Sequence, residues 1–384
     1  MKTILLTAIL AAAPLFAEDG KPKIKPARPR VEVCFVLDTT GSMSGLIEGA
    51  KQKIWGIAND IVAAKPTPEV RFGLVGYRDR GDDYITKRVE LTDDLDTVHA
   101  KLKEFKAAGG GDTPESVSEA LDEAVEKIEW SKDRSVLKII YLVGDAPPQK
   151  YKDGKDWVKA CEAAVKRDLI INTVQCGGDP NTTEVWKAIA SRGEGEFVAI
   201  PQDGAVAVIA TPQDKELAEL SIKLGDTLIA YGNKMQREQL LSKQSDADAS
   251  VGGAVGIAGA SAATKSNVAE RASYNLKSGK AVQGEGELLD ALKNGKLKIA
   301  SVKKDELPEE LRKLSDEEFK AVVAKKQTER DEIQKQIAAI SKQRDAFITI
   351  ERARLTKEKK GDGFDEQVSK SLRKQAEKKG IHYE

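Results

Sequence analysis

Short apolar runs alternate with amphipathic segments through the first half of the chain. Residues 31–37 form one such run with one acidic interruption, 70–77 form a second strand candidate, and 136–143 form the most apolar one. Continuous apolar runs of this length are typical of strands that are buried on both faces. Between the first two runs, apolar residues recur at helical spacing from Leu46 to Ile61. The pattern predicts strands that are joined by helical crossovers.

The remaining segments continue this alternation. Further strands are expected at 85–91, 169–175 and 196–200, and helices at 44–64, 93–105, 114–128, 156–166, 183–190, 202–211 and 214–231. Strands that alternate with helices form right-handed crossovers and a mostly parallel sheet that helices cover on both faces. The predicted fold class is therefore α/β, a doubly wound sheet within residues 31–232, with the segment 85–91 at one edge.

The second half of the chain has a different pattern. Residues 233–265 carry the end of a helix and a Gly- and Ala-rich stretch, which we interpret as a flexible connection or a packing segment. Residues 266–384 are charged and mainly helical, with a candidate strand at 296–302. The sequence therefore predicts a helical C-terminal region after the sheet domain.

A long charged helix is predicted to open at Ser315, which has capping-box spacing to Glu318, and to end near residue 360. Its apolar stripe is interrupted by the basic residues Lys326, Arg330 and Arg344. Basic residues at seam positions weaken a heptad pattern. We therefore expect this helix to pack on a partner helix rather than to form a long coiled coil.

The N-terminus has the pattern of an export signal. Lys2 precedes a short apolar run that ends at Phe16, and Ala17 offers a cleavage point. Residues 1–17 are therefore predicted to be a signal peptide, and the basic, Pro-rich residues 18–30 an exposed linker. No later run reaches the roughly 20 apolar residues that a transmembrane helix needs. The expected location is the periplasm, the cell surface or the medium.

Charge and cysteine content narrow the function classes. The chain carries 62 basic and 62 acidic residues, and this balance argues against nucleic acid as the main partner. Cys34 lies in an apolar run, whereas Cys161 and Cys176 fall at different heights on a helix and the next strand, so no disulfide is expected. With two histidines and no CxxC pair, a zinc site of the usual kind is not expected either.

Oxygen-bearing side chains follow two of the predicted strands and one glycine-rich segment. Asp38, Thr40 and Ser42 stand at alternate positions after the first strand. Thr113 follows three glycines at the start of a predicted helix, and Asp145 follows the most apolar strand. The carboxyl ends of the strands form the ligand site of an open α/β sheet, and carboxylates and hydroxyls suit a small hard cation. We therefore predict one Mg²⁺ (or Mn²⁺) site at this edge.

Each segment also has a simpler interpretation. Asp38 could end a strand while Ser42 or Ser44 caps the next helix, and Asp112 or Thr113 could cap the helix that follows the glycines. Helix capping alone does not explain why three such segments occur, in this order, at the ends of predicted strands. Their convergence favours the metal site.

The segment V-C-F-V-L-D-T-T-G-S-M-S resembles the metal-ion-dependent adhesion site motif, D-x-S/T-x-S, of von Willebrand factor type A (VWA) domains. The resemblance covers about half the chain and implies metal-dependent binding of protein ligands through a partner carboxylate. By motif position, the implied metal ligands are Asp38, Thr40, Ser42, Thr113 and Asp145, with Thr40 in place of the commoner Ser. The tail resembles bacterial proteins in which a charged helical region follows such a domain.

Further side chains are expected around the site. Tyr77, Arg78 and Asp79 follow the second strand and are candidates for contacts behind the metal ligands or on the rim of the ligand site, and Ser44 and Asp112 for the rim. Phosphate-loop and nucleophile-elbow motifs are absent from the sequence, and the histidines do not fit a catalytic triad. The chain is therefore predicted not to be an enzyme.

Three functions are consistent with these sequence features. The first is an exported binding protein whose cation captures an exposed Asp or Glu of a protein or peptide partner. The second is a structural protein of the cell envelope in which the helical tail makes the interactions. The third is a metal-assisted hydrolase, for which Glu115 or Asp112 is the local candidate for a base. The first function best explains a hydroxyl-rich metal site, and it is the function that we predict.

Overall fold

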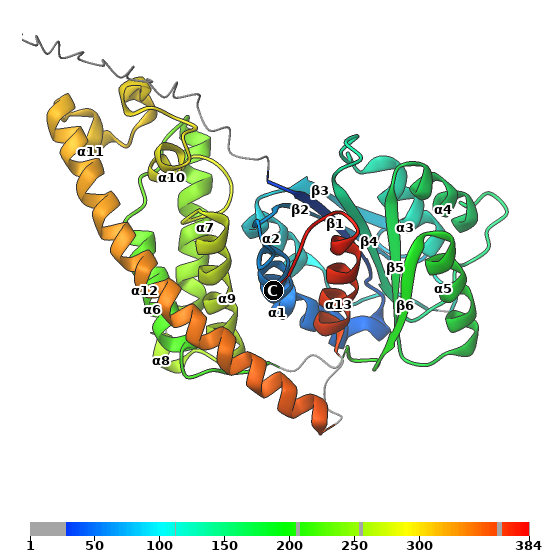
Figure 1. Ribbon diagram of the computed structural model, residues 1–384. Helices are drawn as coiled ribbons and strands as arrows, with labels where there is room; N and C mark the ends of the chain where they lie inside the picture. Colours follow the sequence, from blue (N-terminus) through cyan, green and yellow to red (C-terminus); the bar gives the residue numbers. More distant parts are fainter. Residues whose placement is uncertain (1–27, 112, 205–207, 253–255, 359–362, 384) are drawn as a thin grey trace, which may run out of the picture.

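The structure has two parts, a sheet domain and a helical region beside it (Figure 1). It is a computed structural model that describes residues 28–111, 113–204, 208–252, 256–358 and 363–383. The predicted signal peptide, residues 1–17, and most of the predicted linker, residues 18–30, lie outside these ranges.

A six-stranded sheet forms the core of the first part. Its strands are β1 (Arg30–Asp38), β2 (Glu69–Tyr77), β3 (Thr86–Thr92), β4 (Leu137–Gly144), β5 (Leu169–Cys176) and β6 (Glu194–Ile200). Their order in space is β3-β2-β1-β4-β5-β6, and β3 is the only antiparallel strand of this sheet. β1 lies between β2 and β4 and is buried on both faces, as its continuous apolar run predicts. The predicted α/β fold and the edge position of β3 are confirmed.

Helices cover both faces of this sheet (Figure 1). One face is covered by α1 (Ser44–Val62), α2 (Leu95–Glu104) and α13 (Phe364–Glu377), and the other by α3 (Val117–Asp122), α4 (Trp157–Lys166) and α5 (Pro180–Arg192). A π-helical turn, Glu123–Lys127, continues α3. Because the helices bury their apolar stripes on the sheet, the loops at the strand ends are left to meet a ligand.

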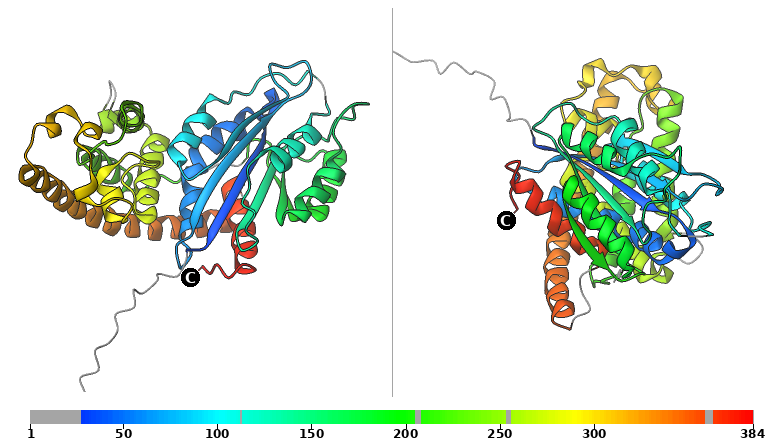
Figure 2. Two further views of the ribbon diagram at one scale, coloured as in Figure 1. Left: turned by 90° about the horizontal axis from the view of Figure 1, so that it is seen from above. Right: turned by 90° about the vertical axis from the view of Figure 1, so that its right-hand side faces the viewer.

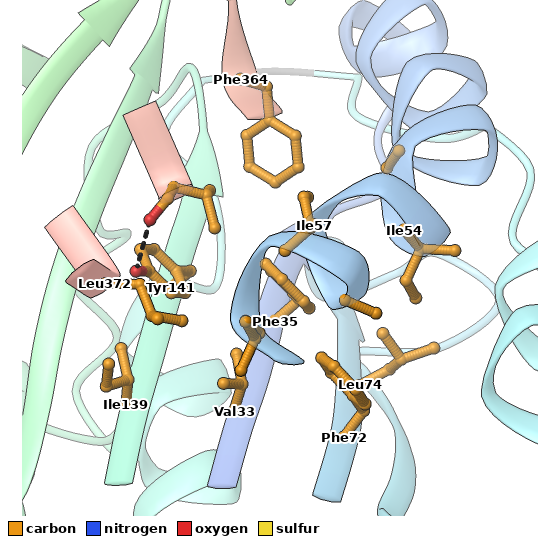
Figure 3. Close-up of a cluster of buried hydrophobic side chains, with 14 of the residues drawn as sticks. Val33, Phe35, Ile54, Ile57, Phe72, Leu74, Ile139, Tyr141, Phe364 and Leu372 are labelled. Carbon is orange, nitrogen blue, oxygen red and sulfur yellow. Dashed lines mark hydrogen bonds between the residues drawn. The ribbon is translucent and has the colours of Figure 1, made fainter. Parts of the chain in front are cut away.

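The helix α13 belongs to the sheet domain, although the whole helical region separates it from β6 along the chain. Figure 3 shows Phe364 and Leu372 of α13 among buried side chains of the sheet and α1, such as Phe35. The Tyr141 hydroxyl of β4 donates a 3.0 Å hydrogen bond to the carbonyl of Val368. The sequence pattern predicts this segment as part of the helical C-terminal region. In the structure the helical region is instead an insertion between β6 and α13.

The helical region packs beside α1 and α2 and contains α6 (Asp214–Asp226), α7 (Lys234–Gly252), α8 (Gly256–Gly259), α9 (Ala262–Ser278), α10 (Leu288–Lys293), α11 (Glu309–Arg312) and α12 (Asp316–Lys357). The long helix α12 runs along α6 and α9 (Figures 1 and 2). Its C-terminal end reaches the sheet domain, where Arg352 lies 3.7 Å from both Asp60 and Asp365. Packing of this helix on partner helices is confirmed.

The predicted capping box at the start of α12 is confirmed. The Ser315 amide donates to the Glu318 carboxylate over 2.8 Å, and the Glu318 amide donates to the Ser315 hydroxyl over 3.2 Å. Each side chain thus satisfies an amide that the first helical turn leaves without a partner.

Short 3-10 turns occur at Gly41–Met43, Ile299–Ser301 and Lys304–Glu306.

Two local predictions in the insertion are wrong. The described part of the segment 202–211 is not helical, because Gly204 has a φ of +80° and its amide closes a turn onto the Pro201 carbonyl. The segment 296–302 forms no strand, since the Ser301 amide bonds back to the Lys298 carbonyl in a 3-10 turn. The Gly- and Ala-rich stretch is mostly helical where it is described, as the end of α7, α8 and the start of α9.

The helix expected at 114–128 begins later than predicted. Its first residue is Val117 and its N-cap is Ser116, not Asp112 or Thr113. The Glu115 amide donates to the Pro147 carbonyl over 3.0 Å, which holds the preceding backbone against the loop after β4. Residues that pair with another loop cannot make the first helical turn.

All three cysteines are free and buried. Cys161 lies in the apolar cluster under α3, α4 and α5, and Cys176 in the cluster under α1, α2 and α13. The sheet separates the two thiols, in agreement with the prediction of no disulfide. Among the described helices, none is both long enough and apolar enough to cross a membrane.

Candidate metal site at the strand ends

The carboxyl ends of β1 and β4 bring two predicted ligands together. β1 ends at Asp38, β4 ends at Gly144, and Asp145 follows, while the two strands pair directly. A Cβ atom at position 144 would lie 2.9 Å from the Cβ of Asp38 and 2.4 Å from the hydroxyl of Tyr77. Glycine therefore allows β4 to end against the Asp38 side chain.

The loop after β1 turns its hydroxyl groups back toward Asp38. Thr40 donates to Oδ1 of Asp38 from its amide over 2.8 Å and from its hydroxyl over 2.6 Å. The Ser42 hydroxyl lies 3.3 Å from that of Thr40. The other oxygen of Asp38, Oδ2, is buried and has no hydrogen-bond partner among the described residues. A buried carboxylate oxygen without a donor is costly, and a cation would stabilise it.

The interpretation of this loop as a helix cap is wrong. The N-cap of α1 is Met43, and the N-cap of the preceding 3-10 turn is Thr40, and neither makes a side-chain cap hydrogen bond. Ser44 is the exposed first residue of α1. The hydroxyls of Thr40 and Ser42 are therefore not used to satisfy helix amides.

Asp145 has a neighbour that sequence reasoning missed. The amide nitrogen of Gln202 donates to Oδ2 of Asp145 over 2.7 Å and lies 3.5 Å from the Ser42 carbonyl. Gln202 follows β6, whose carboxyl end lies on the same edge of the sheet. The sequence pattern predicts a helix at Gln202. Its position just after the predicted strand 196–200 was the signal that could have marked Gln202 as a residue of this edge. Gln202 thus links the loops after β1, β4 and β6.

The glycine-rich loop lies against the first loop. The Gly41 amide donates to the Gly109 carbonyl over 3.2 Å, and the Ala108 amide to the Thr39 carbonyl over 3.1 Å. Gly110 has a φ of +72°, and a Cβ there would lie 2.8 Å from the Cβ of Thr40, so only glycine fits.

The structure does not bring every predicted ligand of the glycine-rich loop to the site. Thr113 is exposed, and its hydroxyl makes no hydrogen bond with any described residue of the site. Asp112 lies outside the described residues. The loop therefore contacts Thr40 through its backbone, and a role for the Thr113 hydroxyl stays a prediction.

Tyr77, Arg78 and Asp79 lie behind the predicted ligands, since each is at most 5% exposed. The Arg78 guanidinium donates to the Thr39 carbonyl over 3.2 Å and to the Lys106 carbonyl over 2.8 Å. Asp79 accepts hydrogen bonds from the hydroxyls of Ser116 (2.7 Å) and Tyr151 (2.5 Å). Of the two positions that the sequence left open for these residues, burial favours contacts behind the ligands over a place on the rim.

Negative charge accumulates at this edge. Burial raises the pKa of Asp38 to about 7, and the carboxylate of Asp145 adds to the shift, although the two hydrogen bonds from Thr40 and the nearby backbone amide of Asp145 oppose it. Burial raises the pKa of Glu115 to about 8, and repulsion from Asp38, Asp79, Asp82 and Asp145 adds to it. No ion pair in the described part of the chain includes Asp38, Asp145 or Glu115, and a divalent cation would supply the positive charge that these carboxyls need.

The donors present suit a hard cation that keeps some of its water. In the described part of the chain, no group of three or more His, Cys, Asp or Glu side chains could hold a metal ion alone. The two carboxylates of Asp38 and Asp145 would therefore need the hydroxyls of Thr40 and Ser42, and water, to complete an octahedron. Oxygen donors of this kind fit Mg²⁺ or Mn²⁺ better than zinc, which prefers nitrogen and sulfur.

Residues 32–192 match the family model of the von Willebrand factor A domain. The chain contains a VWA domain. The match spans β1 to α5, and the strand-end loops described above belong to this VWA domain except for Gln202. The six-stranded sheet with its flanking helices has the VWA-like fold.

Three relatives illustrate the likeness. Hemicentin-2 of Mus musculus is 27% identical over 212 residues, 53% of this chain and 4% of its own length. The von Willebrand factor A domain-containing protein 7 of Rattus norvegicus is 36% identical over 130 residues, 34% of this chain and 13% of its own. The putative ariadne-like RING finger protein R811 of Acanthamoeba polyphaga mimivirus is 20% identical over 238 residues, 56% of this chain and 23% of its own. The chain thus spans less than a quarter of each of these relatives.

Solved structures also resemble the chain. Proximal thread matrix protein 1 from the mussel byssus, with zinc in its MIDAS motif, has 17% identity and a TM-score of 0.35, over 46% of this chain and 43% of that one. The SpRpn10 VWA domain has 14% identity and a TM-score of 0.35, over 46% of this chain and 89% of that one.

Proposed function

We propose that this protein binds a partner protein through a divalent cation at the strand ends of its VWA domain. Asp38, Thr40, Ser42 and Asp145 would hold Mg²⁺ or Mn²⁺, with Thr113 as the fifth ligand that the sequence predicts. An open coordination position would then take an exposed Asp or Glu of the partner. VWA domains typically mediate protein interactions, and this mechanism gives that role a chemical basis.

One observation carries this proposal. Oδ2 of Asp38 is fully buried and has no hydrogen-bond donor among the described residues, at the point where the loops after β1 and β4 meet. Hydroxyls on the first loop supply further oxygen donors without adding charge, so a bound cation would keep positive charge for a partner carboxylate. The guanidinium of Arg78 does not take the place of this cation, because it donates to the carbonyls of Thr39 and Lys106.

Partner capture with and without chelator tests the proposal. The full chain, immobilised, should retain a protein from an extract of its source cells in Mg²⁺ and lose it in chelator. The variant Asp38→Asn should lose it in both buffers, because an amide attracts a cation much less than a carboxylate does. The matched control, Asp153→Asn, removes a carboxylate that is 81% exposed and pairs with Arg80, and it should bind as the wild type does. Retention of the partner at full level in chelator would contradict the proposal.

A structural role for the helical region is the second candidate. It is supported by apolar side chains that α12 leaves at the surface, Phe347 (37% exposed) and Ile350 (71% exposed). If this surface makes the interactions, Ile350→Lys should abolish capture while Asp38→Asn leaves it intact. The opposite result supports the cation-dependent function.

We propose binding rather than catalysis, and a location outside the cytoplasm. Both follow from the sequence, which has an N-terminal export pattern and no catalytic motif. Turnover of a phosphoester or peptide with Mg²⁺ that Asp145→Ala abolishes would contradict the first part. Protein that remains wholly cytoplasmic in fractionated source cells would contradict the second.

A further inference from the structure

Glu115 is a buried carboxylate without a cationic partner. The residue is 4% exposed, and its Oε2 atom has no hydrogen-bond partner in the described structure. None of the described ion pairs includes it, although the nearby Arg78 and Arg80 form pairs with Asp83, Glu119 and Asp153. A buried, unpaired carboxylate destabilises a protein unless something compensates it.

The backbone fixes this carboxylate at the edge that carries the proposed metal ligands. The Glu115 amide donates to the Pro147 carbonyl over 3.0 Å, and the Gln149 amide donates to the Glu115 carbonyl over 2.7 Å. A Cβ at Gly110 would lie 3.1 Å from Oε1 of Glu115 and 2.8 Å from the Cβ of Thr40. Glu115 and Thr40 therefore flank the same glycine, and Glu115 is tied to the loop that begins with Asp145.

We propose that Glu115 is an outer carboxylate of the cation site that acts on the cation through an intervening water molecule. The inference rests on the proposed function, because it needs the cation near Asp38 and Asp145. We infer contact through water rather than direct coordination by Glu115, because no three acidic side chains among the described residues are placed to hold a metal ion together. Mg²⁺ keeps several of its waters in proteins, and a buried carboxylate oxygen is a good acceptor for one of them.

A hydrogen-bonded outer group changes metal affinity without changing the ligand list. Loss of such a partner typically weakens metal binding about 10–100-fold. Glu115 would also add a third negative charge near the cation, after Asp38 and Asp145. The cation would then be held more tightly than the adhesion-site motif alone provides.

Calorimetric titration of the full chain with Mg²⁺ tests this role. Glu115→Gln should raise the Kd for Mg²⁺ at least tenfold. The matched control is Glu119→Gln, because Glu119 also has a buried oxygen without a partner but pairs through its other oxygen with Arg80 over 3.3 Å. This control should change the Kd less than twofold. A twofold or smaller change in Glu115→Gln, while Asp38→Asn abolishes uptake, would overturn the inference and leave the proposed function intact. No Mg²⁺ uptake by the wild type would overturn both.

Thermal unfolding supplies a second readout. In chelator, Glu115→Gln should melt at the same temperature as the wild type or higher, because the substitution breaks no described ion pair and no described hydrogen bond to Oε2. Its gain in melting temperature on addition of Mg²⁺ should be smaller than that of the wild type. A lower melting temperature in chelator would mean that Glu115 stabilises the fold without a cation, which contradicts the inference.

Discussion

The VWA domain and the helical insertion bury their charged residues in different ways. In the VWA domain, two apolar clusters fill the space between the sheet and its helices, and the unpaired buried carboxylates of Asp38 and Glu115 lie at the strand ends. The insertion has smaller apolar clusters, and ion pairs lie inside it. Arg330 is 0% exposed between Glu287 (2.7 Å) and Asp290 (3.0 Å).

We propose that this difference separates charges that stabilise the fold from charges that bind a cation. In the insertion each buried guanidinium meets carboxylates, as Arg344 meets Asp214 over 2.8 Å and Glu270 over 3.3 Å. At the strand ends, none of the ion pairs among the described residues includes Asp38. The VWA domain also pairs a buried charge away from this edge, since Glu32 meets Arg71 over 3.0 Å. The unpaired carboxylates at its strand ends therefore mark a candidate functional site.

The largest effect is expected from removal of α13. A chain that ends at residue 362 would expose the sheet face that Phe364, Val368 and Leu372 cover. Each of these side chains contributes roughly 1.5–3 kcal/mol when buried, and their sum is comparable with the roughly 5–15 kcal/mol that holds a typical domain together. The truncated chain should therefore lose cooperative thermal unfolding, as measured by circular dichroism.

A control on the same helix replaces a side chain that lies outside the core. Lys370→Ala replaces an exposed residue of α13 and should leave the melting curve unchanged within a few degrees. If the truncated chain also melted within a few degrees of the full chain, α13 would not belong to the core of the VWA domain.

The next largest effect is expected from Arg330→Ala in the insertion. The substitution leaves Glu287 and Asp290 buried without a cation, which should cost about 3–5 kcal/mol of unfolding free energy in urea titrations. Arg354→Ala on the same helix breaks pairs with Glu351 and Glu358 that are partly exposed, and should cost about 0–1 kcal/mol. Equal losses in the two variants would show that the buried pairs do not hold the insertion together.

A smaller effect is expected from acid, through His99 at the contact between α1 and α2. Its Nδ1 accepts from the Trp55 indole over 3.3 Å, and its Nε2 lies 3.2 Å from the Lys51 carbonyl. Burial, with a contribution from Lys103, lowers the pKa of His99 from 6.5 to about 4. The unfolded chain therefore binds a proton that the folded chain excludes, and stability falls as the pH falls from about 6.5 to about 4.

The variant His99→Gln isolates this effect. Over that pH range the wild type should lose about 2 kcal/mol more unfolding free energy than the variant, measured by urea titration at each pH. Parallel pH curves for the two proteins would show that His99 does not stay neutral in the folded state.

The sheet was predictable because its signals are local. β1 and β4 are almost wholly apolar, with one charged residue inside each run (Glu32 and Lys138), and a run of that kind has few stable places other than the middle of a parallel sheet. Asp38, Thr40 and Ser42 could be predicted to lie together because alternate positions after such a strand have a fixed relation to its end. The loops that carry Asp38 and Asp145 could likewise be placed together from strand order alone.

The remaining features depend on contacts that sequence patterns do not record. The pairing of Asn172 in β5 with Gln375 in α13, through amide hydrogen bonds of 3.0 and 2.7 Å, joins residues that the whole insertion separates. The partners of Arg330 are equally distant, so the sequence showed only an interrupted apolar stripe. Glu115 was considered as a base, but its burial depends on the 147–149 loop, whose position the sequence does not indicate.

Crystals of the full chain grown or soaked with Mn²⁺ would locate the cation by its anomalous scattering. We expect one strong anomalous peak between Asp38, the hydroxyls of Thr40 and Ser42, and Asp145, and no peak there in Asp38→Asn. An empty strand edge in a structure soaked at saturating Mn²⁺, or a peak only at another place, would contradict the assignment of this edge as a metal site.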